Sequence, residues 1–118
     1  PFIAYSYDGA SWGTTSLPRG LISNVCFGNG KFLAFNEAPD VVYSSTDGRN
    51  WSTIGNMGQF GREAFFANGY FLSTRGYNLY YSVDGASWKQ ASIPVSQFIF
   101  SVAYGKGLYI APEYNTAQ

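Results

Sequence analysis

Short apolar and aromatic runs alternate along the chain with clusters of Gly, Asn, Asp and Pro, a pattern typical of strands joined by turns. The longest stretch without Gly or Pro is ten residues, from Val95 to Tyr104, which is shorter than an average helix of about 11–12 residues. The pattern therefore predicts an all-β protein. The predicted strands are Phe2–Ser6, Trp12–Ser16, Asn24–Phe27, Lys31–Phe35, Val41–Ser45, Ala64–Phe66, Phe71–Thr74, Leu79–Ser82, Ser101–Tyr104, Leu108–Ala111, and two more beginning at Trp51 and Trp88.

Two phrases each occur three times. The first has Ser, Asp-Gly and Trp at fixed spacing, in Ser6–Trp12, Ser45–Trp51 and Ser82–Trp88, and its tryptophans lie 39 and 37 residues apart. The second centres on a glycine turn between apolar runs, in Val25–Leu33, Ala64–Leu72 and Val102–Ile110. Asp-Gly between strand-like runs is a strong hairpin signal, because Gly accepts positive φ. A fixed period of about 20–50 residues indicates a repeat architecture.

Each period contains four short antiparallel strands, which is the content of one β-propeller blade. We therefore expect a single domain, residues 1–118, of three repeats. It divides into a half-blade at 1–16, blades at 24–54 and 63–92, and a half-blade at 101–111. A β-trefoil, which also has three units of about this length, is the alternative fold.

Composition narrows the class of protein. Charged residues make up 12% of the chain and aromatics 19%, which argues against disorder and favours pleated, half-buried surfaces. The net charge is zero and no Lys/Arg run occurs, so a nucleic-acid partner is not expected. No apolar stretch comes near the ~20 residues of a membrane helix, so no membrane insertion is expected.

The sequence offers little for metal or nucleophilic chemistry. It has no His and a single Cys, so zinc sites and Cys/His or Ser/His/Asp catalytic groups are excluded. Cys26, between Val25 and Phe27, is interpreted as a small buried hydrophobe. One Asp and one Ser at each turn fall short of the six to eight oxygen ligands of calcium. We therefore expect neither a metal nor a cofactor.

The phrase Ser-x-Asp-Gly-x-x-Trp resembles the Asp-box, or BNR repeat, of sialidase-like propellers, whose usual form, Ser-x-Asp-x-Gly-x-Thr-Trp, has one more residue. With the Phe-Gly-Asn-Gly-Lys-Phe phrase, it is similar to repeats of bacterial and phage propellers, some in tail and adhesion components. The resemblance covers nearly the whole chain. The sequence leaves the compartment open, with an extracellular or virion-associated location favoured. The resemblance implies that the phrase is a structural hairpin, usually remote from the binding site. The residues given this structural role are Ser6, Asp8, Trp12, Ser45, Asp47, Trp51, Ser82, Asp84 and Trp88.

Three blades are too few for a closed propeller, which typically has about four to eight. The spacing of the two half-blades suggests that the last half-blade of one chain pairs with the first of another. We therefore expect a head-to-tail homodimer that closes a six-bladed ring and covers the strand edges. The alternatives are a piece of a longer propeller, a designed consensus-like sequence, or nine blades from three chains.

Positions that differ between the repeats are candidates for function. Loops expected on one face carry aromatic and planar polar side chains, which suit sugars because C–H faces stack on rings while hydroxyls hydrogen-bond. The main hypothesis is a non-catalytic, lectin-like binding module. A structural or protein-docking propeller of a phage or cell-surface assembly is the alternative, and a sialidase-like glycosidase fragment is a third hypothesis. No catalytic residue is assigned, because no sialidase motif is present. The predicted ligand-binding residues are Glu37, Arg62, Arg75, Tyr77, Glu113, Tyr114 and Asn115.

Overall fold

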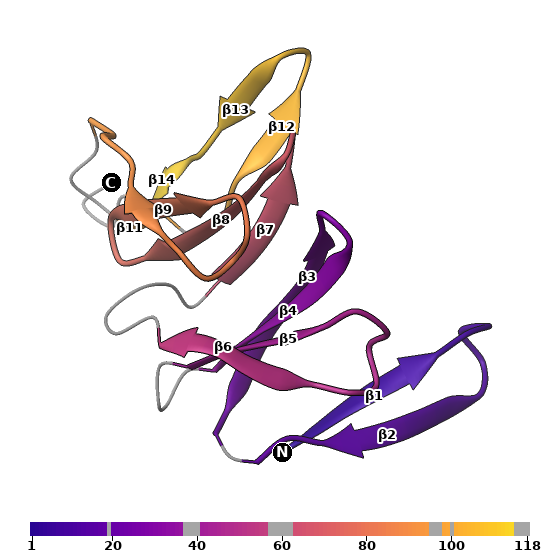
Figure 1. The fold of residues 1–118 in the computed structure, drawn as a ribbon. Helices are drawn as coiled ribbons and strands as arrows, with labels where there is room; N and C mark the ends of the chain where they lie inside the picture. The colour runs from indigo at the N-terminus through magenta and orange to yellow at the C-terminus, as the bar shows by residue number, and fades with distance from the viewer. Residues whose placement is uncertain (19, 37–40, 57–62, 95–97, 100, 115–118) are drawn as a thin grey trace.

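The structure is a computed structural model, which describes residues 1–18, 20–36, 41–56, 63–94, 98–99 and 101–114, with only the backbone described at 55, 56 and 114. Within these residues every regular element is a strand, so the expected all-β class is confirmed (Figure 1). The described part of the chain has no helix with the length and apolar character needed to cross a membrane.

Two four-stranded antiparallel sheets form the centre of the molecule (Figure 1). The first, sheet B, has the order β3-β4-β5-β6, with β3 at Ile22–Gly28, β4 at Lys31–Asn36, β5 at Val41–Ser45 and β6 at Ser52–Asn56. The second, sheet C, has the order β7-β8-β9-β10, with β7 at Glu63–Ala67, β8 at Tyr70–Arg75, β9 at Asn78–Ser82 and β10 at Lys89–Gln90. Each sheet contains one sequence repeat, and its strands follow the chain in order.

Three two-stranded ladders flank these sheets. The first hairpin pairs β1 (Phe2–Ser6) with β2 (Trp12–Ser16), and the last pairs β12 (Ala103–Gly105) with β13 (Leu108–Ile110). A short ladder between β11 (Phe98–Ile99) and β14 (Glu113–Tyr114) was not predicted from the sequence. The described residues form no closed barrel, so the structure gives the trefoil alternative no support.

The hairpins β3–β4, β7–β8 and β12–β13 each turn through two residues with the same backbone conformation. Asn29, Asn68 and Lys106 have φ values of 49°, 51° and 51°, and the following Gly30, Gly69 and Gly107 have φ values of 82°, 87° and 77°. Two successive residues with positive φ define the tight hairpin turns whose twist matches that of the strands. The predicted glycine turns are therefore confirmed.

Strands β4 and β5 of sheet B are buried on both faces. Successive side chains of a strand point to opposite sides, so each face has its own set of residues. Leu33, Phe35 and Val42 point toward sheet C and share a core with its Ala64 and Phe71. On the other face Ala34, Val41 and Tyr43 form a second core with Leu17, and Ile3 of β1 packs against that core. Arg49 also lies over the Tyr5 ring of β1, with its Cζ 5.2 Å from the ring centroid.

The sheets are also joined at their ends. Strand β3 lies against β7, and Asn24 Nδ2 donates a 2.8 Å hydrogen bond to Glu63 Oε2. Asn29 Nδ2 donates to the Gly69 carbonyl at 3.1 Å, and Tyr109 Oη donates to the Ala67 carbonyl at 2.6 Å. The chain therefore stacks β1–β2, sheet B, sheet C and β12–β13 in sequence order (Figure 1).

Candidate functional site

The three Ser-Asp-Gly-Trp turns have the same hydrogen bonds. In the turn after β1, Ser6 Oγ donates to Asp8 Oδ1 at 3.1 Å, while the Gly9 amide donates to Ser6 Oγ at 2.7 Å. The Ala10 and Ser11 amides both donate to Asp8 Oδ1 at 2.8 Å. Equivalent contacts surround Asp47 and Asp84. The Ser and Asp side chains therefore hold the turn amides, as predicted.

The tryptophan of each phrase closes the turn from the other side. The indole Nε1 of Trp12 donates to the Gly9 carbonyl at 3.1 Å, and Trp51 and Trp88 make the same bond to Gly48 and Gly85 at 3.0 and 2.9 Å. Trp51 and Trp88 are half-buried between sheets, but the side chain of Trp12 is 61% exposed. These turns are thus saturated with internal hydrogen bonds, which fits a structural role.

The same hydrogen bonds lower the pKa of all three aspartates. The Ser11 amide, followed by the Ala10 amide, holds the pKa of Asp8 below its ordinary value of 3.8, and the Ser87 and Ala86 amides do the same for Asp84. For Asp47 the main causes of the lowered pKa are the hydrogen bonds from the Asn50 amide and then the Arg49 amide, and the Asn50 side chain adds to this effect. The folded chain therefore favours charged aspartates at the turns.

This shift predicts the direction of acid unfolding. A lowered folded-state pKa contributes stability that is present above the unfolded-state value and is lost as the pH falls through the folded-state value. We expect the urea midpoint to decrease steadily as the pH is lowered from about 5 to about 2. Asp47→Asn keeps an oxygen acceptor without a charge, so its midpoint should depend less steeply on pH. An unchanged slope in that variant would contradict the assignment.

Part of the predicted ligand site is brought together by the fold. Glu37, Arg62 and Asn115 lie outside the described residues, and only the backbone of Tyr114 is described. Arg75 and Tyr77 lie at the turn between β8 and β9. The Ile99 amide of β11 donates to the Gly76 carbonyl at 2.8 Å, and Ile99 pairs with Glu113 of β14. The two distant segments that carry Arg75, Tyr77 and Glu113 therefore lie together at one end of sheet C.

The surface of this end is aromatic and partly charged. The Tyr77 side chain is 55% exposed and that of Phe98 is 46% exposed, while Arg75 is half-buried and Glu113 is exposed. The Phe98 ring lies 3.8 Å from the position that a Cβ at Gly76 would occupy. Sequence reasoning missed Phe98, although its partner Tyr114 was predicted. We call Arg75, Tyr77, Phe98 and Glu113 the end cluster.

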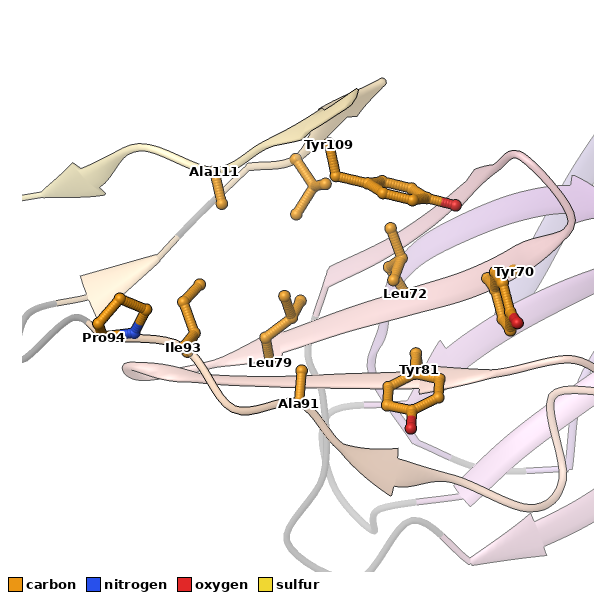
Figure 2. Close-up of a pocket in the computed structure, with 10 residues that line it drawn as sticks. Tyr70, Leu72, Leu79, Tyr81, Ala91, Ile93, Pro94, Tyr109 and Ala111 are labelled. Atoms are coloured by element: carbon orange, nitrogen blue, oxygen red, sulfur yellow. The ribbon is translucent and has the colours of Figure 1, made fainter. Parts of the chain in front are cut away.

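A second feature, an apolar groove, was not predicted at all. It has a volume of about 500 Å³ and lies between sheet C and the β12–β13 hairpin (Figure 2). Leu72, Leu79 and Tyr81 line it from sheet C, and Tyr109 and the neighbouring Ala111 line it from the hairpin side. Its lining is almost entirely hydrocarbon and aromatic, which suits an apolar occupant and not an ion.

The described residues contain no group of three or more His, Cys, Asp or Glu side chains that could hold a metal ion. Cys26 packs against the core between the two sheets, and burial raises the pKa of its thiol to about 12. A thiol with such a pKa is protonated at neutral pH and is therefore a poor nucleophile.

No protein-family model matches the chain, and no curated protein matches it. The structure itself defines the class as an all-β protein of repeated antiparallel sheets. Within the described part of the chain, the end cluster and the apolar groove are candidate interaction surfaces.

Proposed function

We propose that the chain is a non-catalytic, carbohydrate-binding module built from propeller blades of the Asp-box kind. The observation that carries the binding function is the exposed aromatic pair of the end cluster, Tyr77 and Phe98, beside the Gly76 turn and next to Arg75 at the end of β8. Glu113 pairs with Ile99 and so lies on the other face of the β11–β14 ladder from Phe98. Aromatic faces stack on the C–H surfaces of sugars. Guanidinium groups donate hydrogen bonds to sugar hydroxyls, and carboxylates accept hydrogen bonds from them. Tyr77, Phe98 and Arg75 bring aromatic and guanidinium groups to the same end of sheet C.

The blade interpretation is supported by the packing of the sheets. Each four-stranded sheet is one repeat, neighbouring sheets pack face to face through shared cores, and their first strands, β3 and β7, lie together. A first strand near a common axis and a last strand at the rim is the order of a propeller blade. We propose further that two copies join head to tail and close a six-bladed ring.

The binding function is tested by a glycan array probed with the intact protein. Tyr77→Ala should weaken binding about tenfold, or about 1.4 kcal/mol, because it removes the exposed stacking face. Tyr77→Phe keeps the ring and should bind nearly as well. The matched control is Tyr7→Ala, because Tyr7 is 83% exposed on a different turn. All three variants should melt close to the wild-type temperature.

The array and a fluorogenic sialoside assay together separate the alternatives. Binding that Tyr77→Ala leaves unchanged would move the site away from the end cluster. No binding to any glycan would favour the structural or protein-docking propeller. Release of the fluorophore by the wild type would favour the glycosidase hypothesis and overturn the non-catalytic proposal.

A further inference from the structure

The first hairpin exposes the face that its counterparts bury. In the β1–β2 hairpin Ile3 points toward sheet B, while Phe2 and Trp12 are 72% and 61% exposed. Aligning the repeats on the Ser-Asp-Gly-Trp phrase places Trp12 at the position of Trp88, which packs at 5.7 Å, ring centroid to centroid, on Phe35 of the preceding sheet. The β1–β2 hairpin therefore presents an apolar face with no sheet described against it.

The apolar groove is the corresponding surface on sheet C. By the same alignment Leu72 and Leu79 match Leu33 and Val42 of sheet B. Leu33 and Val42 pack against sheet C, and their side chains are only 0% and 1% exposed. On sheet C the β12–β13 hairpin covers one side of this face and leaves the groove on the other (Figure 2). The groove thus lies where the second half of a four-stranded sheet would pack.

The strand edges match as well as the faces. Hairpin β12–β13 corresponds to β3–β4, and β1–β2 corresponds to β5–β6. In sheet B the two halves are joined by β4 pairing with β5. Among the described residues no strand pairs with the outer edge of β13 or of β1. An open edge on each half is a template for pairing with another chain.

The geometry points to a second copy of this chain as the occupant: its β1–β2 hairpin pairs with β13 and lays Phe2, Ala4 and Trp12 into the apolar groove. This inference rests on the proposed blade arrangement and is independent of carbohydrate binding. The new sheet has the order β12-β13-β1-β2, with its last two strands from the second copy. Its register follows from Ala34 opposite Tyr43 and Ser73 opposite Tyr80, which places Ala111 opposite Ala4 of the second copy.

The exchange is reciprocal and explains further exposed apolar residues. Val25 and Phe27, on the β1–β2 side of sheet B, are 51% and 54% exposed. On β13, Leu108 and Ile110 are 56% and 58% exposed. In the completed sheet the β13 face carrying Leu108 and Ile110 covers Val25 and Phe27 of the other copy. The described residues of each copy form two complete and two half sheets, so two copies joined in this way give six sheets, within the range of about four to eight for closed propellers.

The test combines a measurement of the molecular mass in solution with a designed disulfide between copies. Light scattering of the 13.0 kDa wild type should give twice that mass. In a Cys26→Ala background, Ala4→Cys with Ala111→Cys should form a disulfide between copies, because directly opposed residues of antiparallel strands have Cα atoms about 4.5–5.5 Å apart, within the range for a disulfide. In one copy these positions lie in segments at opposite ends of the molecule (Figure 1). The cross-linked species should run at double mass on a non-reducing gel and at single mass after reduction.

The matched control replaces Ala4→Cys with Tyr7→Cys, which lies beyond the end of β1 and is also exposed. It should cross-link several-fold less. A wild type that stays at single mass at every concentration overturns the inference, as does a triple mass. A double mass with equal cross-linking of both pairs overturns the register. A cross-linked dimer that binds no glycan would sustain this inference while contradicting the carbohydrate proposal.

Discussion

Replacing Phe35 with alanine is expected to lower the free energy of unfolding by about 3–5 kcal/mol, the usual cost of truncating a buried phenylalanine. The side chain is 1% exposed and shares a core with Val42, Ala64 and Phe71, so its loss leaves a cavity between sheets B and C. It also removes the edge-to-face contact with the Trp88 ring. Since domains are stable by only about 5–15 kcal/mol, much of the total stability would be lost. Urea denaturation followed by tryptophan fluorescence measures the effect.

Phe35→Leu is the matched control, because it keeps most of the volume and should cost less than about 1.5 kcal/mol. If Phe35→Ala cost no more than Phe35→Leu, the two sheets would not share the core described for them. A large difference between the two variants is expected only if sheet C packs directly on sheet B.

The strands of the two complete sheets could be predicted because their turns are encoded locally. Val41–Ser45 was predicted with its observed bounds, and Asn24–Phe27 lies inside the observed β3. Asp-Gly and Asn-Gly fix where each hairpin turns, and the alternation of side chains then fixes the register. Neither step needs information from distant parts of the chain.

The ladder between β11 and β14 escaped prediction because no turn joins its strands. Ile99 and Glu113 are separated by a whole hairpin, so no local signal marks them as partners. The repeat did contain the signal: Ile99 aligns with Ile22 and Glu113 with Asn36, and those two residues pair in sheet B. β11–β14 and β12–β13 are thus the interrupted counterpart of the long hairpin β3–β4.

The candidate surfaces show the same limit. Arg75, Tyr77 and Glu113 were predicted as a set because they differ between repeats. Only the fold brings their segments together, where the Ile99 amide donates to the Gly76 carbonyl. The apolar groove was missed because an apolar residue in a strand does not reveal whether its face is covered. Trp12, Trp51 and Trp88 are equivalent in sequence, yet only Trp12 is mostly exposed. Whether such a tryptophan is buried depends on whether another sheet packs against its face, and the repeated sequence itself cannot specify that.

Gly85→Ala is expected to cost about 2–5 kcal/mol, from backbone strain of about 1–2 and overpacking of about 1–3 kcal/mol. Gly85 has a φ of +81°, which a residue with a Cβ adopts at a cost. A Cβ at Gly85 would also lie 2.6 Å from Leu33 Cδ1, and Leu33 is 0% exposed and cannot swing into solvent. The glycine therefore sets how closely the turn of sheet C approaches sheet B.

Gly69→Ala separates the two contributions. Gly69 has a φ of +87°, and no atom lies within 4 Å of the position that a Cβ would occupy there, so only the strain of about 1–2 kcal/mol applies. A double-mutant cycle with Leu33→Ala then isolates the contact. Because the truncated Leu33 no longer meets the new methyl group, Gly85→Ala should cost about as little in that background as Gly69→Ala does in the wild type. If Gly85→Ala kept its full cost without the Leu33 side chain, strain alone would account for the loss, and the close approach of the two sheets at this turn would have no part in stability.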